Sequence, residues 1–494
     1  MERAIIGASV LIGYSILVLL IGVWAYRHRK LSVEDYVTTG STMGLLVLMF
    51  TYSATYHSAF AFMGTAGWVF RDGVGWWVNG LWTVLPGVAF WIIGRRVWAL
   101  GKKCGYLSLG HYIRGVYDSL PLGILVAIIG IIFVFPYIGL QAAGVGYIFY
   151  QMTGGIVTPW MSSLIFIVLL TAYTWLGGMR GIAWTDTLQG LIMLVAIPLG
   201  GFLIASSTFG GVGSLYAAGA EWVPSMFTLP GARGAMTYTG WLSTWIPITA
   251  GMIVMPHVFL RYFAGINLRT MKWAAVGSCF FLTFIYVLVP AVGIGGKMLM
   301  PNVGVSDQIF LELLLKYLPF GLVAFMFAGA LAASMSTADS QLHASSVLLA
   351  NDIYGQVTKA SSKSLFFITR YVVVIFAVVS LAIAWMGLTF ADLLKISTAG
   401  LAVLSPSIIG PLFWSRSNDK GAWASIIGGM TSLVILQFVI GSILGISSAL
   451  WAFIISIILF IAVSCLSTPN ESVLKHYNFL RAVLGKNVET SQKQ

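Results

Sequence analysis

Charged residues are scarce in this chain. Only 9% of its 494 residues are Asp, Glu, Lys or Arg, whereas a soluble domain carries about a quarter. The mean hydropathy is +0.92, and apolar runs of about 20 residues, each long enough to cross a bilayer, recur along the whole length. The shortage of charge therefore argues against a soluble protein and predicts an all-α polytopic membrane protein.

Cysteine and histidine are also rare, and this argues against an enzyme. The 3 cysteines are scattered without metal-ligand spacing, and the 6 histidines are dispersed with no His/Glu metal pattern or activated nucleophile. The net charge of +12 is interpreted as orientation charge on loops, not as a nucleic-acid-binding surface. The expected partners are the lipid bilayer and small solutes, and no obligate protein partner is indicated.

Apolar runs between charged or Gly/Pro-rich breaks predict about 13 transmembrane helices. They lie near 4–26, 43–69, 74–100, 121–152, 159–178, 184–205, 238–262, 273–297, 311–346, 364–387, 390–416, 421–441 and 447–466. Because this number is odd, the two termini are expected on opposite sides of the membrane.

The distribution of Lys and Arg predicts which terminus lies inside. If the N-terminus is outside, the cytoplasmic segments hold 21 of the 27 Lys and Arg residues. The other six are Arg3, Arg71, Arg233, Lys297, Lys316 and Lys395. The positive-inside rule then places the N-terminus outside and the C-terminus in the cytoplasm. Compact loops and a short tail are typical of a prokaryotic plasma (inner) membrane protein.

Two predicted spans carry polar residues or helix breakers at mid-membrane depth. The first contains "FTYSATYHSAFAFMGTAG" (50–67), and the second contains "GWLSTWIPITAGMIVMPHVFLRYF" (240–263). Interrupted helices at corresponding places in two halves indicate the binding site of a secondary transporter. Since these spans are five apart, spans 2–6 and 7–11 are expected to form an inverted repeat.

Several longer segments resemble the sodium:solute symporter family, over nearly all of spans 1–11. They are "YTWLGGMRGIAWTDTLQG" (173–190), "LAASMSTADSQL" (331–342), "MPHVFLRYFA" (255–264) and "STAGLAVLSPSIIGPLFW" (397–414). The resemblance implies a leucine-transporter-type fold of two inverted five-helix repeats, with extra helices at both ends. It also implies alternating access driven by a sodium gradient.

This resemblance divides the chain into six segments. They are an extra N-terminal helix and cytoplasmic loop (1–42), the first inverted repeat (43–205), a Gly/Ser-rich extracellular loop (206–237), the second inverted repeat (238–416), two peripheral helices (417–466) and a cytoplasmic tail ordered only in part (467–494).

The resemblance further implies a site for Na+, the co-transported ion, between the first broken helix and the "MST" helix. Its ligands would be the carbonyls of Ala54, His57 and Ala333 and the hydroxyls of Ser336 and Thr337. Residues 333, 336 and 337 share one helix face, and neutral oxygens suit a hard cation. The alternative is that such hydroxyls bond back to their own helix. That alternative is preferred for Ser334, Ser340, Ser345 and Ser346.

Four charged residues near the cytoplasmic side have expected roles other than sodium coordination. Resemblance places Asp186 in the sodium exit path, although it could equally be a charge at a helix N-terminus. Asp339 is expected to form a structural salt bridge or cap. Arg180 and Arg261 are interpreted as anchors on the cytoplasmic side.

The solute is predicted from what the first broken helix lacks. Residues 51–67 contain no Asp, Glu, Asn or Gln, so an ammonium group would find no counter-charge there. A carboxylate instead needs hydroxyl, amide or half-helix donors. The candidate binding residues are Tyr52, Tyr56, Ser58, Gln141, Thr244 and Thr249.

"PYIGLQ" (136–141) and "GYLSLGHYIRGVYDS" (105–119) look most like the monocarboxylate branch of the family. The sequence therefore predicts a symporter for a small organic anion of the lactate, pyruvate or acetate type. A sodium/pantothenate or sodium/proline-type symporter is the alternative, and a transporter-like membrane sensor is the alternative from another class. Proton coupling stays open, although sodium is preferred because neither broken helix carries an acidic residue at mid-membrane depth.

Overall fold

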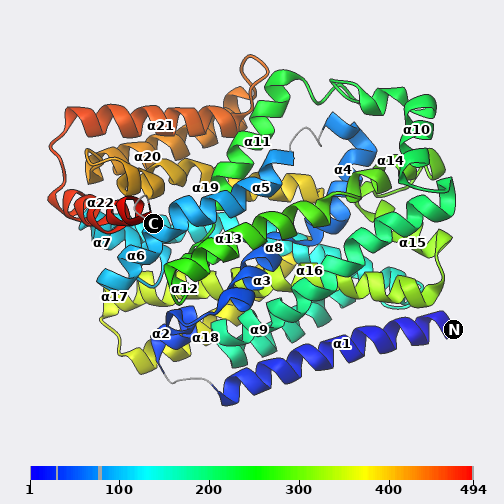
Figure 1. Ribbon diagram of the computed structural model, residues 1–494, viewed down its shortest axis with the longest axis horizontal. Coiled ribbons are helices and arrows are strands. Elements are labelled where there is room, and N and C mark those ends of the chain that lie inside the picture. Colours follow the sequence, from blue (N-terminus) through cyan, green and yellow to red (C-terminus); the bar gives the residue numbers. More distant parts are fainter. Residues whose placement is uncertain (1, 29–31, 76–79, 492–494) are drawn as a thin grey trace.

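The computed structural model describes residues 2–28, 32–75 and 80–491, and its regular structure is helical (Figure 1). The α-helices are α1 (Glu2–Arg27), α2 (Val33–Thr38), α3 (Leu45–Tyr56), α4 (Thr65–Asp72), α5 (Gly80–Ala89), α6 (Arg95–Cys104), α7 (Leu109–Tyr117), α8 (Leu120–Met152), α9 (Pro159–Phe209), α10 (Val212–Trp222), α11 (Tyr238–Ile253), α12 (Pro256–Ala264), α13 (Leu268–Tyr286), α14 (Val289–Leu299), α15 (Ile309–Tyr317), α16 (Phe320–Val347), α17 (Gly355–Thr358), α18 (Ser362–Ala384), α19 (Phe390–Phe413), α20 (Asp419–Ile435), α21 (Ser448–Leu466) and α22 (Glu471–Ser491).

Short helical segments with other hydrogen-bonding patterns connect several of these helices. The 3₁₀ segments are η1 (Thr39–Ser41), η5 (Pro224–Phe227) and η6 (Ser306–Gln308). The π-helical segments are η2 (Phe60–Gly64), η4 (Phe90–Gly94), η7 (Leu348–Tyr354) and η8 (Leu436–Ile440). The most important of them for the site is η2, because it follows the point at which the helix of one span is interrupted.

The number of spans agrees with the sequence prediction. Ten described helices are long and apolar enough to cross a membrane, and two bent helix pairs raise the number to 12. The 51-residue α9 would be roughly 77 Å long at 1.5 Å per residue, enough for two crossings. Its backbone turns at Gly178, where φ is 54° and ψ is −155°. Counting α9 as two spans gives 13.

Gly178 permits this turn for two reasons. Its positive φ is a conformation that residues with a Cβ adopt rarely. A Cβ built on Gly178 would also lie 2.5 Å from the ring of Tyr36. The "GG" of the quoted 173–190 segment is thus where one span ends and the next begins.

Three segments differ from the prediction. The span expected at 311–346 begins at Phe320, directly after Pro319, and residues 309–317 form the separate short helix α15. The long loop at 206–237 contains α10 and η5. The polar tail forms the helix α22. The side chain of Asn470 caps its start by accepting from the N–H groups of Ser472 and Val473 at 2.9 and 3.2 Å.

The two bent pairs are the two spans predicted to be discontinuous. The axes of α3 and of the η2–α4 segment differ by 57°, and those of α11 and α12 by 45°. α3 packs against α9, α13, α16 and α12, while α11 packs against α19. The broken helices therefore lie in the interior of the bundle, whereas α20 and α21 pack mainly against each other and against α19.

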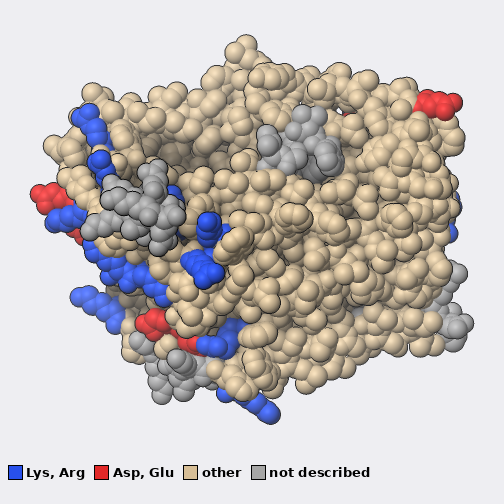
Figure 2. All heavy atoms as spheres, viewed as in Figure 1, with Lys and Arg blue, Asp and Glu red and all other residues tan. Residues whose placement is uncertain are grey.

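Charge is concentrated at one end of the molecule. Figure 2 shows Lys and Arg gathered mainly on the left, the end that carries α22, α6, α7 and α17 in Figure 1, while the long face between the ends is almost free of charge. Such a face suits contact with lipid. The lone N-terminal helix α1 begins at the opposite end from α22 (Figure 1).

Candidate functional site

The first break is held open by hydrogen bonds from outside its own helix. His57, which follows α3, has an extended backbone with φ −91° and ψ 106°. The N–H of Ala59 donates to Gln141 Oε1 at 2.8 Å, and the N–H of Phe60 donates to Ser58 Oγ at 3.1 Å. Tyr137 donates its hydroxyl to the same Ser58 oxygen at 2.9 Å. These contacts satisfy N–H groups that would otherwise be buried without partners.

The break frees carbonyls that face two hydroxyls of α16. Ser336 Oγ lies 3.0 Å from the carbonyl oxygen of Ala54 and 3.2 Å from that of Ala333. Thr337 Oγ1 lies 3.2 Å from the carbonyl oxygen of His57. All five residues are fully buried. The structure thus brings together the five oxygens that the sequence analysis assigned to a sodium site, and such neutral oxygens are suitable ligands for a hard monovalent cation.

One further oxygen in this group was missed. The carbonyl of Thr55 accepts from Thr337 Oγ1 at 3.2 Å, so Thr337 spans two carbonyls of the break. No pattern in the sequence singles out Thr55, because the angle at which the two helices cross decides which carbonyls point at α16. The oxygen group of Ala54, Thr55, His57, Ala333, Ser336 and Thr337 is called the oxygen cage below.

The ring of His57 points away from the cage. It lies 5.4 Å from the Phe281 ring and 5.1 Å from the Tyr286 ring, measured between centroids, and both partners belong to α13. His57 Nδ1 is 3.1 Å from the carbonyl oxygen of Ser53. Only the backbone of His57 therefore contributes to the cage.

The other serine hydroxyls of α16 that the sequence analysis considered differ in their hydrogen bonds. Ser334 and Ser346 donate to carbonyls of their own helix at 3.1 and 2.7 Å, as expected. Ser340 does more: its oxygen accepts from Arg261 Nη2 at 2.5 Å and its hydroxyl donates to Asp339 at 3.2 Å. The hydroxyl of Ser345 has no hydrogen-bond partner among the described residues.

Arg261 is among the largest fully buried side chains of the described residues, so its interpretation as an anchor on the cytoplasmic side is wrong. It forms an ion pair with Asp186 at 3.0 Å, with both side chains 0% exposed. Thr51, one turn before the cage on α3, donates to the same carboxylate oxygen at 2.5 Å. A buried charge needs a partner of opposite sign, and the guanidinium of Arg261 supplies it here.

The surroundings of Asp186 and Asp339 differ from two of the roles considered for them in the sequence analysis. Asp186 lies eight residues beyond Gly178, inside α9, so it is not a first-turn helix charge. Asp339 accepts from the hydroxyl of Tyr173 at 2.8 Å and belongs to no ion pair between described residues. Arg180, in contrast, pairs with Asp35 at 2.5 Å and is 24% exposed, as an anchor would be.

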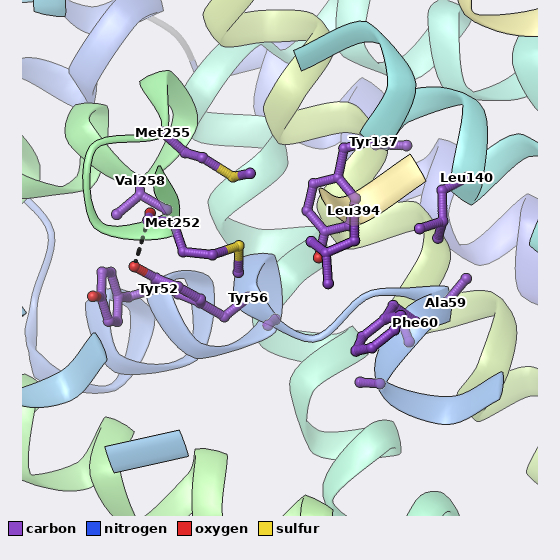
Figure 3. Close-up of a cluster of buried hydrophobic side chains, with 14 of the residues drawn as sticks. Tyr52, Tyr56, Ala59, Phe60, Tyr137, Leu140, Met252, Met255, Val258 and Leu394 are labelled. Atoms are coloured by element: carbon purple, nitrogen blue, oxygen red, sulfur yellow. Dashed lines mark hydrogen bonds between the residues drawn. The ribbon is translucent and has the colours of Figure 1, made fainter. Parts of the chain in front are cut away.

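The structure brings three of the predicted solute residues together at the breaks. Ser58 and Gln141 hold the first break, as described above. Tyr56 donates its hydroxyl to the carbonyl of Met252, next to the second break, at 3.2 Å (Figure 3). In that view Tyr137 and Phe60 belong to the same cluster of buried side chains. Tyr56 therefore bridges the two broken helices.

Of the remaining predicted solute residues, Tyr52 lies beside Tyr56, with 5.1 Å between the ring centroids, while Thr244 and Thr249 lie elsewhere on α11. Tyr52, one turn before Tyr56, donates its hydroxyl to the carbonyl of Pro86 at 2.7 Å. Thr249 is half-buried on α11. Thr244 lines a cavity of about 630 Å³ between α11, α19, α20 and α21 and donates to Gly240 of its own helix at 2.9 Å. The structure therefore does not group Thr244 with the tyrosines.

The chemistry of the site is that of neutral oxygens and aromatic rings. Among the described residues, no group of three or more His, Cys, Asp or Glu is placed to hold a metal ion. Residues 238–253 of α11, like residues 51–67, contain no acidic side chain. The arrangement can coordinate a hard cation through carbonyls and hydroxyls.

Comparison with solved structures establishes the fold. A Na+-coupled sialic acid symporter in a substrate-bound, outward-open state aligns with a TM-score of 0.74 at 20% identity, covering 94% of this chain and 98% of that chain. MhsT in complex with L-phenylalanine aligns with a TM-score of 0.56 at 14% identity, covering 85% and 98%. These relatives confirm the predicted leucine-transporter-type arrangement of inverted repeats.

Comparison of sequences identifies the family. A sodium/pantothenate symporter of Haemophilus influenzae is 26% identical over 84% of this chain and 87% of its own length. The high-affinity proline transporter PutP of Bacillus subtilis is 27% identical over 84% and 89%. The model of the sodium:solute symporter family matches residues 36–429. The chain belongs to the sodium:solute symporter family, and it couples the movement of a small organic solute to Na+.

Proposed function

We propose that this protein imports a small organic monocarboxylate together with Na+ by alternating access. The observation that carries the proposal is the oxygen cage at the first break. Its five predicted oxygens converge without any carboxylate, so a sodium ion can be coordinated and then released. The ligands we assign are the backbones of Ala54, His57 and Ala333 and the hydroxyls of Ser336 and Thr337.

The absence of acidic side chains at both breaks supports an anionic solute. An ammonium group placed between Tyr56 and Tyr137 would meet only neutral oxygens and aromatic rings. A carboxylate could instead accept from hydroxyls and from the N–H groups at the start of a half-helix. We therefore assign Tyr56, Ser58 and Gln141 to the solute site, with lactate, pyruvate or acetate as the first solutes to test.

Pantothenate is the second candidate, and a specific observation favours it. Two relatives, 26% and 27% identical to this chain, are sodium/pantothenate symporters. Pantothenate is itself a monocarboxylate, so it fits the same reasoning about charge. A proline-type solute has similar support from relatives but would need a counter-charge for its ammonium group.

The segment boundaries and the orientation are part of the proposal. We assign residues 43–205 and 238–416 to the two repeats, and the end rich in Lys and Arg in Figure 2 to the cytoplasm of a prokaryotic inner membrane. The cage would then lie between the outer helices α4 and α11 and the inner helices α3 and α12. The same orientation places the ion pair of Asp186 and Arg261 on the cytoplasmic side of the cage.

We infer that this ion pair lines the path by which Na+ leaves. Thr51 donates to Asp186 from one turn below the cage, so an ion moving inward from Ser336 would meet that carboxylate next. Arg261 neutralises Asp186 while the path is closed. Competition between Na+ and Arg261 for the carboxylate would then link ion release to opening.

The experiment is uptake of labelled lactate, pyruvate, acetate, pantothenate and proline into proteoliposomes, with an inward sodium gradient, a proton gradient or neither. Ser336→Ala and Thr337→Ala are compared with the parent protein. Ser334→Ala is the matched control, because Ser334 is a buried hydroxyl of the same helix that bonds only to its own backbone. We expect sodium-dependent uptake of one carboxylate that is lost in the first two variants and kept in the control.

The other outcomes separate the alternatives. Uptake of proline alone would overturn the anionic-solute argument, while uptake driven only by protons would overturn the sodium cage. Binding of a solute without any transport would favour the sensor interpretation. An equal loss of uptake in Ser334→Ala would mean that α16 tolerates no change, and the cage assignment would lose its support.

A further inference from the structure

Thr244 lines a cavity to which Tyr52 and Tyr56 do not contribute. The oxygen cage does not explain this cavity. It measures about 630 Å³, within the range typical of small-molecule sites. Its walls come from the first halves of α11 and α19, from the α20–η8 segment and from the start of α21. In the proposed orientation all of these segments lie in the outer half of the membrane.

One cation lines this cavity. Lys395 lies on the second turn of α19, is exposed, and lines the cavity together with Asp392. Its ammonium lies 4.8 Å from the centre of the Trp68 ring, so it sits between α4 and the cavity. Lys395 takes part in none of the ion pairs between described residues.

The acidic side chains nearby have partners of their own. Asp72 pairs with Arg233 at 2.7 Å, and Asp307 pairs with Arg71 at 3.1 Å. Asp392, one turn before Lys395, closes the capping box of α19: it accepts from the hydroxyl and the N–H of Thr389 at 2.6 and 3.3 Å. Asp392 keeps its negative charge, because both of its partners are neutral, but its carboxylate is directed at Thr389. The ammonium of Lys395 is the cationic group of the cavity that an entering anion would bind.

The other walls suit the rest of an organic acid. Thr244 and Thr398 already donate their hydroxyl protons to Gly240 and Leu394, so they offer the cavity only acceptor oxygens. Phe133, Ile248 and Leu433 give it apolar walls. A carboxylate would be held by Lys395, a hydroxyl or amide of the solute could donate to the threonines, and a carbon chain would rest on the apolar side.

A series of side-chain contacts links Lys395 in the cavity to the first break. The Trp68 ring that contacts Lys395 stacks on Trp245 of α11 at 5.7 Å and meets Phe60 of the first break edge-on at 6.0 Å. We propose that this outer cavity is a capture site for the solute, in which Lys395 binds the carboxylate before the tryptophan pair opens. The inference rests on the proposed import of a monocarboxylate and adds the residue that selects its charge.

The test compares Lys395→Gln, Lys395→Arg and a control, Lys316→Gln, in proteoliposomes. Lys316 is an exposed lysine of α15 whose ammonium lies 5.4 Å from the Tyr317 ring and which does not line the cavity. The probes are the labelled acid that the parent protein imports and its neutral analogue: lactamide for lactate, or panthenol for pantothenate. Uptake gives KM and kcat, and competition by the analogue gives the preference for the acid.

We expect Lys395→Gln to raise KM for the acid about tenfold or more, since a charge-assisted hydrogen bond is lost. We expect kcat and the sodium dependence to change little, and the preference for the acid over its analogue to fall by about the same factor as KM rises. Lys395→Arg should restore the preference, and Lys316→Gln should behave as the parent. An unchanged KM, or a preference retained in Lys395→Gln, would overturn the capture site while leaving the proposed function intact. A parent protein that imports no carboxylate would overturn the proposed function first and this inference with it.

Discussion

The two broken helices reach the same geometry by different means. The second break has a local cause: Pro256 is the first residue of α12, and Met255 before it has the extended ψ of 135° that a following proline favours. The first break contains neither proline nor glycine in residues 51–59. It is held by Gln141 and Tyr137, which belong to α8. The comparison shows that one interruption is encoded locally and the other depends on a neighbouring helix.

The halves of the two helices also pair differently on the two sides of the breaks. On one side, Arg261 of α12 donates to Thr51 of α3 at 3.2 Å, and the backbones at Met43 and Gly265 form a parallel bridge. On the other side, α4 and α11 meet through the stacked rings of Trp68 and Trp245. One contact is charged and fully buried, while the other is aromatic and easier to separate. This asymmetry predicts a ranking of mutational effects.

The largest effect is expected from Arg261→Met. The variant leaves Asp186 buried without its counter-charge, and breaking a buried pair costs about 3–5 kcal/mol. Thermal unfolding in detergent, followed by size-exclusion chromatography, should show a strongly destabilised protein. The double variant Arg261→Met with Asp186→Leu should recover much of that loss, because no unpaired charge remains. A single variant as stable as the parent would mean that the ion pair between α9 and α12 does not hold this side of the breaks together.

A medium effect is expected from Gln141→Leu. The N–H of Ala59 loses its acceptor, and an unsatisfied buried donor costs about 1–3 kcal/mol. Because the cage carbonyls belong to the same break, the sodium concentration for half-maximal uptake should rise as well. Gln141→Glu keeps an acceptor of the same length and should retain more of the sodium affinity. Equal sodium affinities in the two variants would show that the first break does not need α8.

A smaller effect is expected from Trp245→Leu. Stacking of the kind seen with Trp68 contributes about 0.5–1.5 kcal/mol beyond area burial, so its loss should favour the outward-open state by about two- to tenfold. The measurement is the labelling rate of Met252→Cys, at a buried position beside the second break, by a membrane-impermeant maleimide, with and without the tryptophan variant. Trp245→Phe, which keeps a ring, should lie between the two. Identical labelling rates would exclude the tryptophan pair as an outer gate.

The smallest effect is expected from Pro256→Ala. The first position of a helix needs no N–H donor, so no contact is lost. Stability should fall by only about 0.4–1 kcal/mol, through greater freedom of the unfolded chain. Thermal unfolding of Pro256→Ala beside Gln141→Leu measures the contrast directly. A loss from Pro256→Ala as large as that from Gln141→Leu would mean that the breaks do not differ in origin.

Much of the fold followed from the sequence because hydropathy is a local property. The spans, the break at Pro256 and the spacing of Ala333, Ser336 and Thr337 on one helix face could all be predicted from short segments. The helix α22 in the polar tail was not predicted, and one of the contacts that hold it is the hydroxyl of Ser472, which donates to the carbonyl of Gly115 at 3.0 Å. That contact joins residues too far apart in the chain for a local pattern to reveal.

The roles of two charged residues could not be predicted from the sequence. The positive-inside rule led to the interpretation of Arg261 as an anchor on the cytoplasmic side. In the structure its counter-charge is Asp186, 75 residues earlier in the chain. Lys395 was counted only as one of six outer cations, and its place beside Trp68 and the cavity could not be inferred from its neighbours in sequence. In both cases the role of the charge depends on its partner, and the partner comes from another helix.

The sequence by itself determined the class of protein, the number of spans, the position of the break before Pro256 and the hydroxyl face of α16. It could do so because these properties depend on hydrophobicity, on the missing N–H of proline and on helical spacing. Only the tertiary structure decided which carbonyls of α3 face those hydroxyls, that Arg261 neutralises Asp186, and that Lys395 lines an outer cavity. Coordination, ion pairing and cavities arise where helices cross, and the crossing is fixed by the packing of the whole bundle.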